Sequence, residues 1–285
     1  HDLISVILKQ SFMDGFENGD EIMAAAHAKW AMQRSDPHYA SPSARLKVAI
    51  LDAHGRRRWH ELWEGLDYIA RPDEASDLDI VNGPSIRPYY TGMSGNRILW
   101  KTGAPRPGEI RLTDEERRGP QQMGIATPYL VIEPKFKAAG GGGANKDWGI
   151  NNWRKAAAEI GKFITLVEVS DPRALAGIDH VYQRSGGTFR HACAILERSI
   201  GYVGHEGGLH HAASALGRDA VVVFGGYISP EVTGYHGHTN LYTNDDRYPL
   251  GCGSVTPCEH CRESMSKITV EQVVAAVKEM MKCQN

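Results

Sequence analysis

The chain has 285 residues, a length that favours two domains over one. Hydrophobic residues make up 41% and charged residues 23%, which excludes a mostly disordered protein and predicts a buried core. The formal net charge of -2 excludes binding of a polyanion through an overall positive field, so any nucleic-acid contact has to be local.

The sequence contains no run of about 18 apolar residues and no N-terminal secretion signal. We therefore expect a cytoplasmic protein without a transmembrane segment, with peripheral association at the inner membrane as an alternative. The five cysteines are an odd number in a chain without a secretion signal, so no disulfide framework is expected.

The first part of the chain predicts alternating strands and helices. Residues 3–8 are a short apolar run typical of a buried strand, and a loop with glycines leads into an alanine-rich helix over residues 21–30. A strand over 47–52, an amphipathic helix over 59–69 and a short strand over 78–81 follow. This alternation is typical of a parallel sheet.

A region rich in Gly, Pro and charge, residues 92–122, shows no clear period and is expected to be a linker. It ends an N-terminal domain of residues 1–122, and residues 123–285 form a second αβ series. The second series has strands at 129–132, 163–169, 200–203 and 220–224, and helices at 152–160, 189–197, 209–216 and 270–281. The final helix, 270–281, is expected to pack back toward the N-terminal domain.

The most informative segment is the Gly-rich turn after the strand that ends at Val203. Gly207 and Gly208 stand where a helix begins, so backbone N–H groups and the helix dipole can face an anion such as a diphosphate. A tight strand-to-helix turn without a ligand is the competing interpretation. Glu168 and Asp171 follow the strand 163–169 at the ligand-binding edge of an open sheet, where a carboxylate can accept from ribose hydroxyls or simply cap the next segment.

Three segments, in this order, resemble glycosyltransferase family 9, the heptosyltransferase-like enzymes. Residues 18–23 resemble the family's N-terminal Gly-Asp loop, and residues 145–149 resemble its Lys-x-Trp segment. Residues 202–226 resemble its signature of an acid, a His at the start of an Ala-rich helix, and a strand that ends Phe-Gly. Glu206 stands where the family usually has Asp, and Gly207 where it often has Thr, so the acid is kept and a hydroxyl ligand is lost.

The resemblance implies a GT-B fold, in which two Rossmann-like domains face each other across a cleft, and an inverting, metal-independent glycosyltransferase. It implies that Asp20 is the general base and that Lys146 contacts the donor phosphates, with Glu206, Gly207 and Gly208 in the same donor site. Thr188 resembles the segment that lines the nucleotide pocket. For Asp20 and Thr188 the alternative is a helix N-cap, and for Lys146 it is a solvated surface charge.

The resemblance favours ADP-heptose or a related ADP-sugar as donor. The expected acceptor is a hydroxyl on a lipopolysaccharide core, on another glycan or on a modified nucleic-acid base, so nucleic acid enters only as an acceptor. The basic run Arg56, Arg57 and Arg58 follows the strand 47–52 and is a candidate contact for an anionic acceptor, with a solvated loop as the alternative.

Cys252, Cys258 and Cys261, with His260 beside them, form a cluster that contains one C-x-x-C pair. A structural metal at these three cysteines is one interpretation, and reduced bystander thiols are the other. No metal is expected in catalysis. Two other functions remain open: a nucleotide-sugar epimerase of GT-B architecture, and a non-catalytic protein that binds nucleotide sugars or interacts through a metal-clipped loop.

Overall fold

The computed structural model describes residues 18–35, 46–82, 89–103, 105–125, 127–134, 143–170, 178, 181–185, 188–243 and 246–282. The expected strand over 3–8 and the candidate residue Asp171 lie outside these ranges. Within them, no helix is both long and apolar enough to span a membrane.

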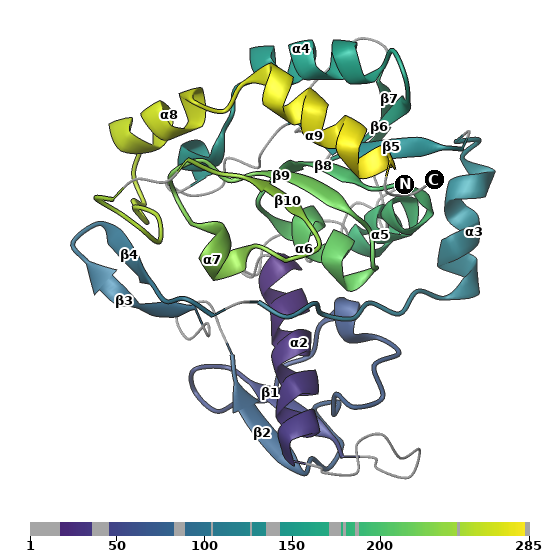
Figure 1. The fold of residues 1–285 in the computed structure, drawn as a ribbon. Coiled ribbons are helices and arrows are strands. Elements are labelled where there is room, and N and C mark those ends of the chain that lie inside the picture. The colour runs from purple at the N-terminus through teal and green to yellow at the C-terminus, as the bar shows by residue number, and fades with distance from the viewer. Residues whose placement is uncertain are drawn as a thin grey trace, which may run out of the picture.

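A six-stranded parallel sheet forms the core of the C-terminal half (Figure 1). Its strands are β5 (Tyr129–Glu133), β6 (Thr165–Ser170), β7 (Tyr182–Ser185), β8 (Tyr202–His205), β9 (Ala220–Val223) and β10 (Thr239–Leu241). They lie in the order β10-β9-β8-β5-β6-β7. This is the strand order of a Rossmann fold, and it confirms the predicted α/β class. The order reverses between β5 and β8, and ligands of such sheets bind where the carboxyl ends of those two strands meet.

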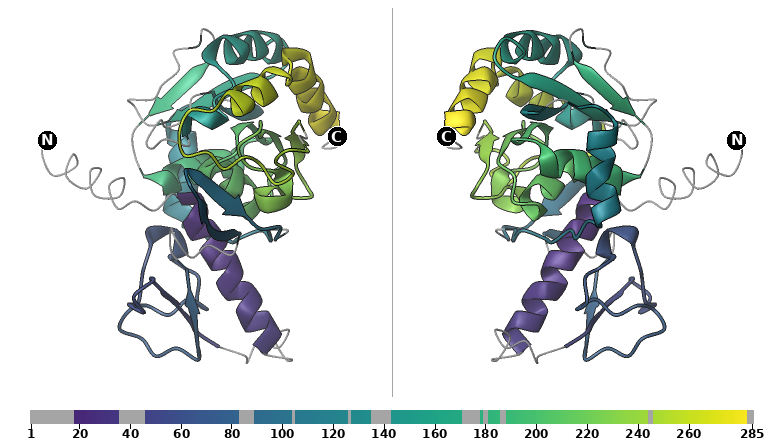
Figure 2. Two further views of the ribbon diagram at one scale, coloured as in Figure 1. Left: turned by 90° about the vertical axis from the view of Figure 1, so that its left-hand side faces the viewer. Right: turned by 90° about the vertical axis from the view of Figure 1, so that its right-hand side faces the viewer.

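Helices cover both faces of this sheet (Figures 1 and 2). One face packs against α4 (Ile150–Ile160) and α9 (Val270–Lys282), and the other against α5 (Phe189–Arg198) and α6 (Gly208–Ala215). The described part of the final helix, α9, contacts α4 and the strands β9 and β10. These contacts of the described residues lie within the C-terminal half, whereas the sequence predicted that this helix packs toward the N-terminal domain.

Three short elements complete the described C-terminal half: η2 (Gly143–Lys146), α7 (Pro230–Thr233) and α8 (Glu259–Ser266). The turn η2 precedes α4, and α8 contacts η2 across the end of the sheet.

The described N-terminal part contains α2 (Asn18–Ser35) and a parallel pair, β1 (Val48–Leu51) and β2 (Leu78–Val81). The helix expected over 59–69 is wrong, because only the 3-10 turn η1 (Glu61–Trp63) forms there. Gly65 has a φ of +80°, which an α-helix cannot accommodate. The apolar side chains of this segment are nevertheless buried, apart from the partly buried Trp59. The indole of Trp63 donates to the carbonyl of Glu21 on α2 at 2.9 Å.

The expected linker contains more structure than its composition indicates. It forms a hairpin of β3 (Tyr90–Ser94) and β4 (Arg97–Trp100), turned at Gly95, and the helix α3 (Asp114–Gln122). A capping box of Thr113 and Glu116 begins α3, which packs on α5. Arg97 of the hairpin forms an isolated antiparallel bridge with Ser254, so the hairpin and α3 connect the N-terminal part to two places on the C-terminal half.

Candidate functional site

The N-terminus of α2 meets α6 of the C-terminal half, and this contact carries the candidate site. Gly19 lies against the imidazole of His211, so closely that a Cβ on Gly19 would be 2.5 Å from the Cδ2 atom of His211. On its other side, the Nε2 atom of His211 lies 3.6 Å from the Oε1 atom of Glu206. Gly19, the neighbour of the predicted base Asp20, and Glu206 therefore flank the same histidine, although their segments are far apart in the sequence.

Glu206 and Lys146 form a buried ion pair beside the first turn of α6. The ammonium of Lys146 lies 2.5 Å from the Oε2 atom of Glu206, and the two side chains are 12% and 5% exposed. Burial tends to raise the pKa of Glu206, but the Lys146 charge and the His211 contact outweigh burial and hold that pKa well below its usual value. Glu206 is therefore ionised at neutral pH, and Lys146 is held at the end of β8.

The turn after Glu206 is built as the sequence predicts. Gly207 is the N-cap residue of α6, Gly208 is its first residue, and no side chain of the described part caps this end. The first amides of a helix lack intrahelical acceptors, so the start of α6 presents donors and the positive end of a dipole. A lysine ammonium and a helix N-terminus together suit a phosphate.

His205, at the end of β8, holds the lysine-bearing segment in place, a role that sequence reasoning missed. Its Nε2 atom accepts from the Trp148 amide and from the Trp153 indole, each at 3.1 Å. Burial lowers the pKa of His205 to about 4, so the ring is neutral and can accept both bonds. The bonds from Trp148 and Trp153 to His205 thus position the segment that carries Lys146. Only the chemistry of a buried His next to Glu206 could have indicated this.

Glu133 is a second residue that sequence reasoning missed, because the predicted strand ended one residue before it. It ends β5, directly beside the end of β8, and its Oε2 atom accepts from the Tyr202 hydroxyl at 2.5 Å. Burial raises the pKa of Glu133 to about 7. The predicted ribose ligand Glu168 is fully buried in the adjacent strand β6, pairing in register with Ile132 of β5. Carboxyl groups therefore gather at the switch point of the sheet.

Asp20 lies within the first turn of α2 and not before it, so the described helix does not use it as an N-cap residue. Asp20 is 8% exposed, and its Oδ1 atom accepts from the Tyr89 hydroxyl at 2.6 Å. Two aromatic contacts continue from Tyr89, to Trp100 at 6.2 Å and from Trp100 to Tyr227 at 5.6 Å between ring centroids. The ammonium of Lys146 lies 5.2 Å from the Tyr227 ring. These contacts join Asp20 to Lys146 by a second route.

Thr188 serves in the structure as the N-cap of α5, in a reciprocal pair with His191. This is the alternative that the sequence left open, and no contact places Thr188 beside Lys146 or Glu206 within the described residues.

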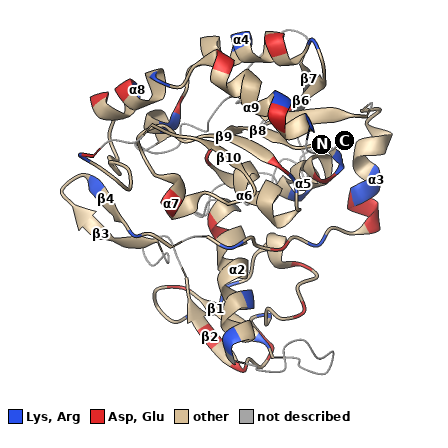
Figure 3. Ribbon diagram, in the orientation of Figure 1, with Lys and Arg blue, Asp and Glu red and all other residues tan. Residues whose placement is uncertain are grey.

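The three arginines of the basic run diverge. Arg56 pairs with Asp52 and is 75% exposed, while Arg57 bonds to the Glu74 carbonyl and the Ser76 hydroxyl. Arg58 forms a buried ion pair with Glu21 on α2 and also donates to the Asn82 carbonyl. Basic and acidic residues are interspersed over both halves (Figure 3). Each arginine therefore has a partner within the chain.

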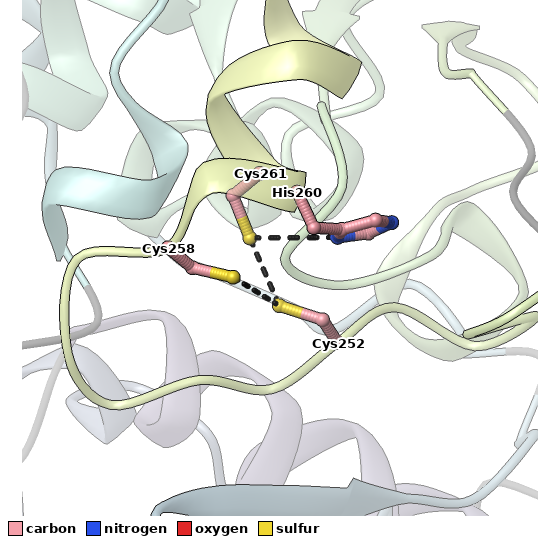
Figure 4. Close-up of side chains that lie close together, drawn as sticks. All are labelled: Cys252, Cys258, His260 and Cys261. Atoms are coloured by element: carbon pink, nitrogen blue, oxygen red, sulfur yellow. Dashed lines mark hydrogen bonds between the residues drawn. The ribbon is translucent and has the colours of Figure 1, made fainter.

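The cysteine cluster assembles in space at the start of α8 (Figure 4). The Cys252 sulfur lies 2.9 Å from that of Cys261 and 3.9 Å from that of Cys258. With His260, the ligand atoms of the group lie within 4.8 Å of one another. The Cys261 thiol lowers the pKa of Cys252 to about 5 by hydrogen bonding. The donor set of three thiols and an imidazole is one that structural zinc sites use.

Glu206, His210 and His211 also place one ligand atom each within 4.8 Å of one another. In this group the carboxylate already holds the Lys146 ammonium, whose positive charge disfavours a second cation there.

No family model matches the chain, and no curated protein matches it. Solved structures do resemble it. A glycosyl transferase family 9 protein from Veillonella parvula has 15% identity and a TM-score of 0.47, over 62% of this chain and 54% of that one. The E. coli ADP-heptose lipopolysaccharide heptosyltransferase II has 16% identity and a TM-score of 0.47, over 66% of this chain and 55% of that one.

An iron-containing dodecameric glycosyltransferase from enterotoxigenic E. coli is also similar, with 15% identity and a TM-score of 0.49, over 64% of this chain and 50% of that one. The chain thus spans about half the length of these proteins. Because each TM-score is below 0.5, what the chain does has to follow from its own residues.

Proposed function

We propose that the chain is an inverting glycosyltransferase of the GT-B type that moves a sugar from a nucleoside diphosphate to a hydroxyl acceptor. The observation that supports the proposal is the contact of α2 with α6, in which Gly19, next to Asp20, and Glu206 both lie against His211. The helix that carries the proposed base thus contacts the helix whose N-terminus, with Lys146, can bind phosphates.

The donor diphosphate is the leaving group, and its departure requires stabilisation of negative charge. Lys146 and the amides at Gly207 and Gly208 supply that stabilisation in the proposal, so no catalytic metal is needed. In the structure the Lys146 ammonium already holds Glu206. When the donor binds, its diphosphate replaces Glu206 as the partner of the Lys146 ammonium. The released Glu206 carboxylate can then accept hydrogen bonds from sugar hydroxyls.

Asp20 acts as the general base in this proposal. It takes the proton of the acceptor hydroxyl while the acceptor oxygen attacks the anomeric carbon on the face opposite the diphosphate. The new glycosidic bond forms as the carbon–oxygen bond to the diphosphate breaks, and the configuration inverts. Glu133 and Glu168, at the carboxyl ends of the neighbouring strands, are the candidates for hydroxyl groups of the nucleotide.

The expected donor is an ADP-sugar such as ADP-heptose, and the expected acceptor is a hydroxyl of a lipopolysaccharide core, another glycan or a modified nucleic-acid base. Of the three arginines proposed to contact an anionic acceptor, Arg56 has the most exposed side chain described for the run. Arg57 and Arg58 bond within the N-terminal part and position the loop that carries Arg56.

Product analysis after incubation with a radiolabelled ADP-sugar and a mixture of glycan acceptors tests this proposal. Transfer of the label with release of ADP supports it. An epimerised donor with ADP still attached would identify an epimerase. Binding without any turnover over the whole panel would identify a binding protein, and either of these two results overturns the proposal.

The cysteine cluster is proposed to hold a structural metal ion, with Cys252, Cys258, Cys261 and His260 as ligands. Two thiolates of one tetrahedral zinc ion, each at about 2.3 Å from the metal, lie about 3.8 Å apart. The Cys252–Cys258 separation of 3.9 Å fits this, whereas the Cys252–Cys261 pair has to open from 2.9 Å.

Elemental analysis and chelation test the metal. We expect a stoichiometric ion in gently purified protein, its loss in Cys252→Ser, and its retention in Cys193→Ala, which changes a buried cysteine of α5. Chelation should lower the melting temperature, because metal binding contributes to folding free energy. A content below about a tenth of a metal ion per chain would show that the cluster consists of reduced thiols.

A further inference from the structure

Tyr89 immediately precedes the hairpin strand β3 and reaches the acid at the start of α2. Its ring is 6% exposed, and its hydroxyl donates to the Oδ1 atom of Asp20 at 2.6 Å. This is the distance of a charge-assisted bond from a hydroxyl to a carboxylate. Tyr89 and Asp20 are 69 residues apart in sequence, so the bond depends on the tertiary structure and not on local chain geometry.

We propose that Tyr89 is a positioning residue for the transfer reaction, which fixes the direction in which the Asp20 carboxylate faces. The inference rests on the proposed role of Asp20 as base. A carboxylate on a single Cβ can rotate, and a misdirected base loses most of its rate advantage because proton transfer requires hydrogen-bond geometry. One strong hydrogen bond to Oδ1 removes that freedom.

The position of Tyr89 is fixed by contacts within the hairpin and, through Trp100, with the C-terminal half. The Tyr89 carbonyl accepts from the Lys101 amide at 2.9 Å, which closes the base of the hairpin. Its ring packs on Trp100, whose indole donates to the Tyr227 carbonyl at 3.1 Å. The Tyr227 ring also lies beneath the Lys146 ammonium. Tyr89, which holds the proposed base, is therefore linked through Trp100 to the residue that contacts the donor-site lysine.

The far end of the hairpin is fastened to the cysteine loop, residues 252–261 (Figure 1). The Ile98 amide donates to the Gly253 carbonyl at 2.8 Å, and the Val255 amide donates to the Asn96 carbonyl at 2.9 Å. The Arg97 guanidinium donates to the Cys252 carbonyl at 3.1 Å. Both ends of the hairpin thus attach to the C-terminal half, while Tyr89 reaches across to Asp20. The hairpin sets where the base stands relative to the donor site.

A purely structural role makes a different prediction from a positioning role. If the Tyr89–Asp20 bond only stabilises the fold, its loss lowers the melting temperature, and any loss of rate is the same whether or not Asp20 can accept a proton. If Tyr89 acts through Asp20, its removal lowers kcat, leaves KM for the donor unchanged, and has no further effect once Asp20 is disabled.

The experiment is a double-mutant cycle of Tyr89→Phe and Asp20→Asn in the full chain, with Tyr90→Phe as the matched control. Tyr90→Phe removes the same group one residue further along the hairpin. We expect Tyr89→Phe to lower kcat by about 10- to 100-fold, the value of a hydrogen bond to a charged group. We expect Tyr90→Phe to leave kcat within about twofold of wild type.

An unchanged kcat in Tyr89→Phe, or an equal fold loss in the Asp20→Asn background, would overturn the inference. Full activity in Asp20→Asn itself would instead overturn the proposed role of Asp20, so the two failures are distinguishable. If Tyr89→Phe does not fold, Trp100→Phe replaces it in the same cycle. That variant weakens the packing of Tyr89 and leaves Asp20 unchanged. We expect the same loss of kcat, and no such loss in the Asp20→Asn background.

Discussion

Lys146 and Glu206 are each placed to serve two partners, and this governs how single substitutions at the site have to be read. In the structure each is the other's buried counter-ion, and in the proposed reaction Lys146 turns to the diphosphate. Removing one member of a buried pair leaves the other charge without compensation, at a cost of about 3–5 kcal/mol of stability. A loss of function in Lys146→Ala alone therefore mixes unfolding with lost binding.

The double variant Lys146→Ala/Glu206→Gln removes both charges, so its fold should survive while its affinity for ADP falls. We expect about a 10- to 100-fold increase in Kd, because one charge-assisted contact to phosphate is lost. Glu206→Gln alone is the matched control: it loses stability because Lys146 is left without its counter-ion, so its melting temperature is measured beside it, but the folded protein should keep ADP binding, since Lys146 is then released for the phosphates. Titration calorimetry at low salt measures all three proteins. Equal ADP affinity in the double variant and Glu206→Gln would show that Lys146 does not hold the nucleotide.

For this candidate site, the sequence predicts which residues take part more readily than it predicts their contacts. It proposes the Gly207–Gly208 turn, Lys146 and Asp20 because a glycine turn after a buried strand and a resemblance of short segments mark them. Glu133, His205 and Tyr89 were missed, because each acts through a partner 52 to 69 residues away in the chain. Pattern and spacing carry no information on such pairs.

At the scale of elements, the helices α2 and α6 determine the site by how closely they approach. The approach is possible because residue 19 has no side chain, and the His211 ring occupies the space that a Cβ would fill. A glycine inside a helix is normally a cost to stability of about 0.5–1 kcal/mol relative to alanine. At position 19 this loss of stability is offset because the missing side chain lets α2 contact His211 of α6.

Gly19→Ala should therefore destabilise the protein by about 1–3 kcal/mol, the cost of overpacking, in spite of the better helix propensity of alanine. It should also reduce transfer, because α2 has to move away from His211 and carries Asp20 with it. Gly119→Ala in α3 is the matched control, since a Cβ there meets nothing within 4 Å. Urea denaturation of both variants measures the difference. A stabilised Gly19→Ala, like the control, would contradict the close contact.

The sequence predicts an element well where its apolar residues form a regular buried pattern. The strands and helices of the C-terminal half follow from their buried runs and 3.6-residue patterns, and β5, β8, β9, α5 and α9 lie within a few residues of their expected ranges. The short strands β7 and β10 have weak patterns because they lie at the edges of the sheet. The segment 59–69 carries a helical apolar pattern, but Gly65 breaks the helix and the apolar side chains pack from a loop.

At the scale of the whole molecule, burial of neutral histidines makes stability depend on pH. Burial lowers the pKa of His60, His205 and His238 to about 4 each. In the unfolded chain these rings take up protons below about pH 6.5, whereas the folded protein does not until about pH 4. Stability is therefore lost as pH falls through this window. Glu133 acts in the opposite sense, because its raised pKa of about 7 makes stability fall as pH rises from about 4.5 to 7.

Burial also lowers the pKa of His27 and His210 and raises that of Glu61, so five such histidines stand against two such carboxyl groups among the described residues. We therefore expect the free energy of unfolding to decrease from pH 6.5 to pH 4. Each histidine contributes up to about 1.4 kcal/mol per pH unit. Melting temperatures in a series of buffers between pH 7.5 and pH 4.5 measure the effect. His54→Asn, which changes an exposed ring, should leave the slope unchanged. A melting temperature that stays level or rises on acidification would contradict the account.

Single-turnover transfer by Asp20→Asn tests whether the two halves of the chain form one transfer site with Asp20 as its base. Asn keeps the size of the side chain and can still accept from Tyr89, but it cannot take a proton. We predict that the variant binds the ADP-sugar donor as wild type does and melts within a few degrees of it, while the transfer rate falls by about 100- to 10,000-fold. A transfer rate equal to that of the wild type, in a variant that binds donor normally, would show that Asp20 is not the base.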